Sequence, residues 1–381
     1  MRRMTVLTAV LLTSALAVVG CAKDSGSSSG SAQGGPATCT RNAPPAAAPV
    51  TAPTSVVPGP KPNASNLRVG MAFDVGGRGD TSFNDAAAAG LDRAKAELGV
   101  ADTKELTAAV GESKDSTQTR LRQLVDGGYS PAIAVGFDYA PGVAAVAAAE
   151  PNAKFAIVDS TVDGNPPNAT PLLFAEEQGS FLVGVAAALK TKACHIGFVG
   201  GVQNPLIQKF EAGFKQGAKA VAPDIKIDTS YLSPAGDLSG FNDPAKGQES
   251  AKGQLDSGAD IIYAAAGASG NGVLRSIKAA SSPDNPKWGI GVDSDQYQDK
   301  TLGDVKDIIL TSMLKRVDVA VFDYIAAVAS NQVSTLPKEF DLKSDGVGYA
   351  TSGGKVDDIK PQLEAYRAAI INGSIKVSTT P

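Results

Sequence analysis

The chain has 381 residues, of which 43% are apolar and 19% charged, so it is long enough for two domains and apolar enough for a large core. The 39 Asp and Glu outnumber the 35 Lys and Arg, and the net charge of −4 gives no basic excess for binding nucleic acid. The single histidine, His195, excludes a His-rich metal site and is the one candidate base for a Ser–His or Cys–His pair. Because His195 begins an apolar run that predicts a buried strand, we expect neither an enzyme nor a bound metal or cofactor.

The N-terminus has the pattern of a bacterial export signal. Two arginines follow Met1, and an uncharged apolar stretch runs from Thr5 to Val19, followed by Gly20 and Cys21. The stretch is too short to span a bilayer comfortably and fits the hydrophobic region of a signal peptide. Small residues before a cysteine at this place resemble the lipobox, which predicts cleavage after residues 1–20 and acylation of Cys21; a plain signal peptide with an incidental cysteine is the alternative. We therefore expect an extracytoplasmic protein that a lipid anchors to the bacterial cell membrane.

Residues 21–65 are predicted to be a disordered tether behind the lipid-bearing cysteine. They contain no aromatic residue, few charges and eight prolines from Pro36 to Pro62, so they cannot bury enough apolar surface to offset their ordering entropy. In extended form, at about 3 Å per residue, the tether reaches on the order of 130 Å. Cys39 in the tether and Cys194 in the body could pair in an exported protein, and the sequence leaves both states open.

From residue 66 onward, short apolar runs alternate with helical patterns. This alternation is typical of parallel sheets covered by helices on both faces. Strands are predicted at residues 67–73, 132–136, 155–159, 196–200, 225–231, 260–264, 289–293 and 308–313, and helices at 82–98, 118–126, 179–189, 205–220, 245–257, 270–280 and 317–330. Ser82 is the predicted N-cap of the first helix, with Asp85 in the capping-box position and Gly99 closing the helix.

Several of the predicted strands end in, or are followed closely by, a carboxylate or a glycine, namely Asp74, Asp159, Gly267 and Asp293. In open parallel sheets, ligands bind beyond the carboxyl ends of the strands. Any one of these residues could simply start a turn. Four of them, spread over both halves of the chain, favour a ligand site between two lobes.

A glycine-rich turn at residues 74–81 follows the first predicted strand. It has neither the GxGxxG spacing of a dinucleotide site nor the GK[ST] ending of a P-loop. Its two aspartates, Asp74 and Asp80, would repel a phosphate. We therefore do not expect a nucleotide or dinucleotide site here.

The segment from Asp74 to Asp85 closely resembles the opening signature of the basic membrane protein family, whose members are substrate-binding lipoproteins of ABC transporters and include purine nucleoside receptors. Further matches follow in the same order at residues 208–214, 240–247, 264–272, 291–296 and 311–318. The resemblance runs from about Leu67 to the C-terminus. It implies an α/β type I periplasmic-binding-protein fold, in which two doubly wound parallel-sheet lobes are joined by a hinge and close on a ligand in the central cleft.

The resemblance also implies domain boundaries. Lobe one would comprise residues 66–165 and 315–337, and lobe two residues 166–314 and 338–381. The chain would therefore cross between the two lobes more than once.

Aromatic residues of the implied site would hold the purine base, because an aromatic side chain stacks on the flat face of a base. The resemblance places Phe83 in this role on the first lobe, with core packing as the alternative. Phe210 and Phe241 are the candidates on the second lobe, and for each of them core packing is an equal alternative.

Polar residues of the implied site would read the ribose and the base edge. Asp293 would accept hydrogen bonds from ribose hydroxyls, and Lys315 would act as a donor and as its counter-charge; a solvated lysine at a helix start is the alternative. Asp74, Asn84 and Asp159 would bind the base edge or the ribose from lobe one. Asn84 suits a purine edge because its side chain both donates and accepts hydrogen bonds. Asp159 could equally cap the next turn, and Gly267 completes the expected ligand-binding set.

These residues favour a neutral nucleoside, most simply a purine nucleoside, over a nucleotide, because the implied cleft sets several carboxylates against Lys315 and Arg78. We expect a monomeric substrate-binding lipoprotein that serves the permease and ATPase subunits of an ABC importer. The alternatives are a binder of a sugar or autoinducer-like molecule, and a sensory receptor without transport.

Overall fold

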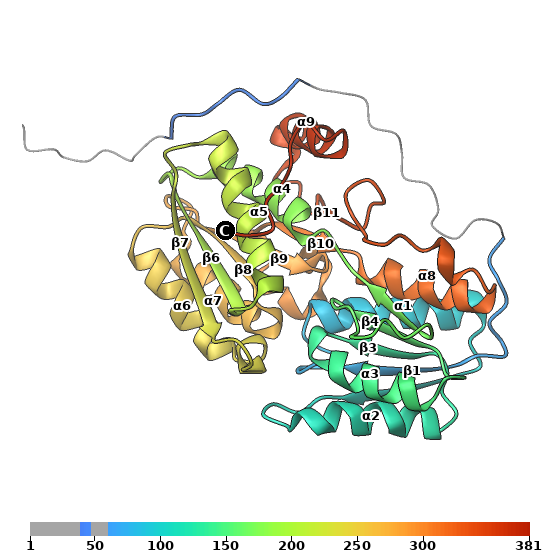
Figure 1. Ribbon diagram of the computed structural model, residues 1–381. Coiled ribbons are helices and arrows are strands. Elements are labelled where there is room, and N and C mark those ends of the chain that lie inside the picture. The colour runs from blue at the N-terminus through green and yellow to red at the C-terminus, as the bar shows by residue number, and fades with distance from the viewer. Residues whose placement is uncertain (1–38, 47–59) are drawn as a thin grey trace, which may run out of the picture. The chain divides into compact units, whose positions relative to one another are not determined.

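Two sheets with helices on both faces make up the part of the chain that the structure describes (Figure 1). This computed structural model describes residues 39–46 and 60–381. The predicted signal peptide and Cys21 lie outside the described residues. In the described ranges, no helix has the combination of length and apolar character needed to cross a bilayer.

The first sheet is parallel throughout, with strand order β2–β1–β3–β4–β5. Alternate residues of β1 face opposite layers: Met71 and Phe73 pack with the helices α1 and α8, and Ala72 packs with α2 and α3. The strands are β1 (Arg68–Phe73), β2 (Asp102–Thr107), β3 (Ala132–Val135), β4 (Phe155–Val158) and β5 (Ala169–Leu172), and the helices are α1 (Phe83–Leu98), α2 (Lys114–Asp126), α3 (Ala140–Ala149) and α8 (Val317–Ala329). Gly99 ends α1, as predicted, and the structure shows it in the left-handed conformation.

The second sheet has the order β11–β10–β9–β8–β6–β7, and only its edge strand β11 is antiparallel. Its core lies on both faces, under α4, α5 and α9 on one side and under α6 and α7 on the other. The strands are β6 (His195–Val202), β7 (Lys226–Ser233), β8 (Ile261–Ala265), β9 (Trp288–Asp293), β10 (Ile309–Lys315) and β11 (Val347–Tyr349), and the helices are α4 (Glu176–Lys190), α5 (Pro205–Val221), α6 (Pro244–Asp256), α7 (Gly270–Ala280) and α9 (Lys360–Ile371).

Three crossovers connect the two sheets: residues 173–175 between β5 and α4, residue 316 between β10 and α8, and residues 330–346 between α8 and β11. The first and third pair with each other, since Phe174 and Phe340 form a parallel bridge and their rings stack at 5.3 Å between centroids. The boundary expected at residue 165 assigns β5 to the second lobe, but this strand pairs with β4 as an edge of the first sheet.

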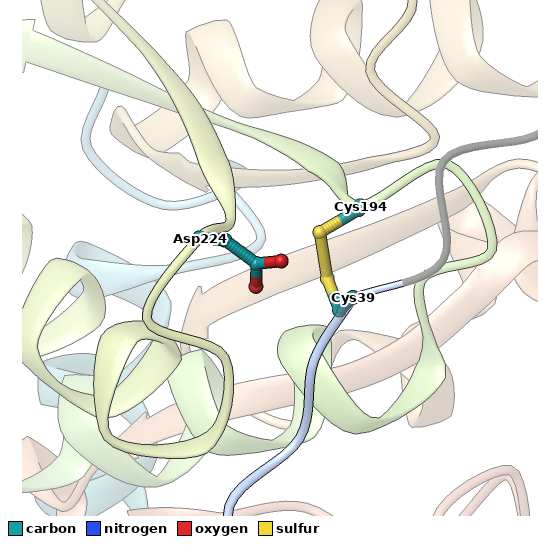
Figure 2. Close-up of side chains that lie close together, drawn as sticks. All are labelled: Cys39, Cys194 and Asp224. Carbon is teal, nitrogen blue, oxygen red and sulfur yellow. A yellow bond between two sulfur atoms is a disulfide. The ribbon is translucent and has the colours of Figure 1, made fainter. Parts of the chain in front are cut away.

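A disulfide between Cys39 and Cys194 attaches residues 39–46 to the residue that precedes β6 of the second sheet (Figure 2). The backbone amide of Asn42 donates to the carbonyl of Val221 at 2.7 Å, and the Arg41 guanidinium donates to the carbonyl of Thr191 at 3.0 Å. This part of the predicted disordered tether is therefore held in place. The disulfide and the hydrogen bonds to the ends of α4 and α5 hold these residues in place, although their composition has too few apolar side chains to form a core.

Candidate ligand-binding site

A cavity lies where the carboxyl ends of strands from the two sheets face each other. It encloses about 560 Å³ of empty space, part of it open to solvent. The residues that the sequence singled out for ligand binding all line it: Asp74, Phe83, Asn84, Asp159, Phe210, Phe241, Gly267, Asp293 and Lys315. The structure thus brings the predicted set together, while the contact of each with a ligand stays a prediction.

The loop after β1 is built around Asn84 and Asp80. Asn84 Oδ1 accepts a hydrogen bond from the Asp74 amide at 3.1 Å, and its Nδ2 donates to Asp80 Oδ2 at 3.1 Å. Asp74 Oδ1 accepts from the Val75 amide at 2.7 Å. Both ends of the Asn84 amide are therefore engaged within the protein, and Asn84 fixes the loop that carries Asp74 into the cavity wall.

Ser82 occupies the N-cap position of α1, as predicted, but Asp80 supplies the capping hydrogen bonds. Asp80 accepts hydrogen bonds from the amides of Asn84 at 2.8 Å and Asp85 at 3.1 Å, whereas Ser82 makes no capping bond. The predicted capping box is wrong because Ser82 Oγ is used elsewhere: it donates to Asp293 Oδ2 at 2.6 Å. Asp85 in turn accepts from amides of the preceding loop.

The contact between Ser82 and Asp293 belongs to a set of hydrogen bonds that joins the two halves of the site. Ser294 Oγ donates to the Ser82 carbonyl at 2.9 Å, and Gln296 Nε2 donates to the Thr81 carbonyl at 3.0 Å. Asp293 is the last residue of β9 and Ser294 follows it, while Thr81 and Ser82 precede α1. The N-terminal end of α1 is therefore bonded directly to the carboxyl end of β9.

Lys315 is the last residue of β10 and is 1% exposed, so it is not a solvated lysine at a helix start. Its ammonium lies 2.5 Å from Asp159 Oδ2 and 3.2 Å from Glu176 Oε1. The sequence predicted Asp293 as its partner, and the structure corrects this: Lys315 is the direct counter-charge of Asp159. Sequence reasoning missed Glu176 because a glutamate in the first turn of a helix also has an ordinary explanation in the helix dipole.

Aromatic side chains enter the cavity from both halves. Phe83 comes from α1, Phe210 from α5, and Phe241 from the turn before α6. Phe83 and Phe210 stand near the ammonium of Lys315, 5.1 and 5.5 Å from ring centroid to Nζ. A Cβ at Gly201 would lie 2.4 Å from Phe241 Cδ1, so glycine is needed there to seat this ring. The sequence did not single out the remaining wall residues Val75, Asp80, Gly136, Phe137, Leu206, Ile207, Ala265, Ala266 and Val292.

Burial shifts the carboxyl groups of the cavity toward their neutral forms. It raises the pKa of Asp74 to about 7, that of Asp80 to about 6, and that of Asp293 above its ordinary value. Burial also raises the pKa of Asp159 to about 7, against the opposing effect of Lys315. For Lys315, burial disfavours the charge, but the surrounding carboxylates outweigh it and raise the pKa, so the ammonium is protonated at neutral pH.

One acceptor in the cavity wall has no partner within the described residues. Asp159 Oδ2 pairs with Lys315, whereas Asp159 Oδ1 is buried without a hydrogen bond. A buried acceptor left unpaired costs about 1–3 kcal/mol. A ligand with a hydroxyl or amino donor at this position would recover that free energy.

The arrangement is suited to binding rather than to nucleophilic chemistry. His195 begins β6, as predicted, and its Nε2 lies 2.8 Å from Asp228 Oδ2 at the amino end of the strands, opposite to the cavity. His195 is not among the described residues that line the cavity. Carboxylates, one ammonium and aromatic rings remain, and these groups are suited to hydrogen bonding and stacking with a ligand.

Comparison with known proteins agrees with this arrangement. A family profile described as ABC transporter substrate-binding protein, PnrA-like, matches residues 67–380. A CD4+ T-cell-stimulating antigen from Listeria monocytogenes is 36% identical over 328 residues, which cover 84% of this chain and 90% of that protein. An ABC transporter nucleoside-binding protein, BmpA, from Lactococcus lactis is 32% identical over 323 residues, which cover 82% of this chain and 89% of that protein.

Solved structures share the fold. The crystal structure of an ABC transporter system solute-binding protein from Aeropyrum pernix matches with a TM-score of 0.70 at 28% identity, covering 82% of this chain and 93% of that one. This confirms the predicted α/β type I periplasmic-binding-protein fold. Since the family profile and both relatives extend over most of the sequence, the chain belongs to the basic membrane protein family of ABC transporter substrate-binding proteins, a family of binding proteins and not of enzymes.

Proposed function

We propose that this protein captures a purine nucleoside in the cavity between its two sheets and delivers it to an ABC importer. The observation that carries the proposal is the combination of aromatic side chains from both halves with buried carboxylates around one enclosed space. A nucleoside offers a flat base and a hydroxyl-rich ribose, and the cavity has a matching group for each. The nucleoside-binding relative from Lactococcus lactis supports the same ligand class.

The base would be held by stacking. Phe83 on one half and Phe241 or Phe210 on the other offer aromatic faces, and each stacked base contributes about 1–3 kcal/mol. A purine has more stacking surface than a pyrimidine, which favours the larger base. A simple sugar would leave these rings without a flat partner.

The ribose and the base edge would be held by acceptors. The unpaired Asp159 Oδ1 and the carboxylate of Asp293 each accept from hydroxyl or amino groups, and Lys315 provides the donor. Lys315 is the one lysine or arginine among the described residues that line the cavity. A nucleotide phosphate would therefore meet Asp74, Asp159 and Asp293 with little compensating positive charge, which disfavours nucleotides.

The protein would act outside the cytoplasm on a lipid tether. The export signal and the lipobox-like cysteine support cleavage before Cys21, and the acylated cysteine would anchor the mature chain. A substrate-binding protein of an ABC importer needs a permease and an ATPase as partners. Two lobes that close on one small molecule need no second copy of the chain, so we propose a monomer.

A thermal-shift screen of the purified protein tests the ligand class. The panel contains inosine, guanosine, adenosine, uridine, free adenine, ribose, glucose and adenosine monophosphate. A ligand at one hundred times its Kd stabilises the folded state by about 2.7 kcal/mol. We expect the largest rise in Tm with purine nucleosides and little with ribose or the nucleotide. Stabilisation by sugars without any by nucleosides would refute the proposed ligand.

A further inference from the structure

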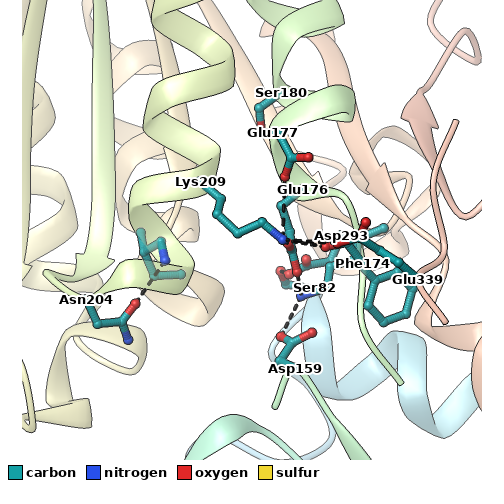
Figure 3. Close-up of polar contacts among 12 residues, drawn as sticks. Ser82, Asp159, Phe174, Glu176, Glu177, Ser180, Asn204, Lys209, Asp293 and Glu339 are labelled. Carbon is teal, nitrogen blue, oxygen red and sulfur yellow. Dashed lines mark hydrogen bonds and ion pairs between the residues drawn. The ribbon is translucent and has the colours of Figure 1, made fainter. Parts of the chain in front are cut away.

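A chain of charges leads from the ligand cavity to the crossovers between the two sheets, and its members are buried except for Lys209, whose side chain is 20% exposed. It starts at Asp159 and Lys315 in the cavity wall, passes through Glu176 at the start of α4, and reaches Lys209 on α5. Figure 3 labels Asp159, Glu176 and Lys209. In the described structure, neither Glu176 nor Lys209 lines the cavity. The charges alternate in sign, so that each buried charge has an opposite charge beside it, as burial requires.

Glu176 joins the two lysines of this chain. Its Oε2 accepts a hydrogen bond from Lys209 Nζ at 2.6 Å, and its Oε1 lies 3.2 Å from Lys315 Nζ. The Glu176 side chain is 1% exposed, so these two lysines and not bulk water lie against its carboxylate. Because Glu176 is shared between the two lysines, Lys209 weakens the attraction between Glu176 and Lys315.

Lys209 also holds two of the crossovers. Its Nζ donates to the main-chain carbonyl of Phe174 at 2.6 Å and lies 3.6 Å from Glu339 Oε1. Phe174 lies in the first crossover and Glu339 in the third, and Figure 3 shows Lys209 extending from α5 toward this group. Burial disfavours the ammonium, but Glu176 and Glu177 raise the pKa of Lys209 above its ordinary value, so it remains a cation at neutral pH.

We propose that Lys209 is a positioning residue for ligand binding: it fixes the crossovers and, through Glu176, the place of Lys315 in the cavity. Without Lys209, Glu176 is left buried with Lys315 as its nearest cation and draws that ammonium away from Asp159. Ligand binding then weakens although the changed residue does not touch the ligand. The identity of the ligand rests on the proposed function, and the positioning role does not.

The first test compares Lys209→Met with Lys215→Met in the whole protein. Met keeps an apolar stem and removes the charge. Lys215 is a matched control, because it lies on the same helix and pairs with the buried Glu211 at a distance from the crossovers. Titration calorimetry with inosine should give a Kd about tenfold higher for K209M, the usual size of coupling from outside a site, and a near wild-type value for K215M.

A double-mutant cycle separates positioning from a general loss of stability. If Lys209 acts through Glu176, then Glu176→Gln added to K209M removes the unbalanced carboxylate and recovers part of the affinity. Lys209→Arg keeps the positive charge and should bind inosine better than K209M does. Equal losses in K209M and K215M, or additive losses in the double variant, would overturn the proposal.

A measurement on the ligand-free protein tests the positioning role of Lys209 even if the proposed ligand is wrong. The amides of Ala175 and Phe340 donate across the paired crossovers, to the carbonyls of Phe340 at 3.1 Å and Leu173 at 2.7 Å. Hydrogen exchange at both amides should be faster in K209M than in K215M. If inosine fails to bind the wild-type protein and this difference still appears, the ligand is wrong and the positioning role stands; equal exchange in the two variants refutes the role.

Discussion

The carboxylate of Asp293 offers a direct test of the proposed site. It is 7% exposed, lines the cavity and accepts a hydrogen bond from Ser82 Oγ at 2.6 Å. Its backbone has φ +63°, a left-handed conformation that Asn adopts readily and Ala does not. We therefore choose Asp293→Asn, which keeps the shape and the backbone of the residue and removes its negative charge.

The expected loss of affinity follows from the hydrogen bonds that the carboxylate would make to ribose. A hydrogen bond to a charged group contributes about 1.5–3 kcal/mol and a neutral one about 0.5–1.5 kcal/mol. Replacing two charge-assisted bonds by one neutral bond should cost about 3 kcal/mol, on the order of a hundredfold in Kd.

The stability of the ligand-free protein should respond in a different way. Burial raises the pKa of Asp293, so folding disfavours its ionised form. Such a group contributes stability below its unfolded pKa and loses that contribution as pH rises through the folded value. At neutral pH the charge is therefore of no benefit to the ligand-free fold, and D293N should melt at or above the wild-type Tm.

Titration calorimetry with inosine and thermal unfolding without ligand decide the matter, with Asp345→Asn as the control. Asp345 also has a left-handed backbone, with φ +58°, but its side chain is 56% exposed and it does not line the cavity. D345N should leave the affinity unchanged. Wild-type affinity in D293N would refute the ribose role of Asp293, and a large drop in the Tm of the ligand-free variant would refute the electrostatic argument.

Phe83→Ala should weaken inosine binding by about 1–3 kcal/mol in calorimetry, with a small change in Tm because the ring is half-buried; the reverse pattern would make Phe83 a core residue. Burial raises the pKa of Asp74 from 3.8 to about 7, so the wild-type protein should lose stability as pH rises through that interval, and Asp74→Asn should flatten the dependence measured by denaturant unfolding. Parallel profiles for the two proteins would contradict this. Replacing Cys39 and Cys194 by Ser removes a link between residues 155 apart and should lower the free energy of unfolding by about 2–4 kcal/mol while leaving inosine affinity intact.

Much of the fold could be predicted from the sequence because buried parallel strands are continuous apolar runs. The elements that were missed lack such runs. β2 carries the half-exposed sequence DTKELT, β5 contains a proline, and β11 has three residues at a sheet edge. α3 consists almost wholly of small and apolar residues, so it shows no polar face to mark a helix. For α9, the buried positions Leu363, Tyr366 and Ile370 do have helical spacing, and the sequence reading overlooked this signal.

The site could be anticipated as a set of residues, but its pairings could not. Ligands bind beyond the carboxyl ends of parallel strands, so Asp74 and Asp159 of the first sheet and Asp293 of the second were expected at one site. Which carboxylate pairs with Lys315 depends on how the two sheets meet, and no local pattern encodes that. For the same reason the capping bond expected from Ser82 is absent: its hydroxyl is engaged by a residue more than two hundred positions away.

The contacts that a nucleoside would meet are also contacts between the two halves of the molecule. Lys315 ends a strand of the second sheet and pairs with Asp159, which follows a strand of the first. Asp293, the last residue of β9, accepts from Ser82, which precedes α1. A ligand that accepts a hydrogen bond from Lys315 or donates one to Asp293 therefore shares these residues with the contacts between the halves, Lys315–Asp159 and Ser82–Asp293. Binding and closure should then be one coupled event, in which each residue of the site affects affinity twice, once through the ligand and once through the closed state. This coupling explains why a residue such as Lys209, outside the cavity but bonded to the crossovers, is expected to change affinity at all.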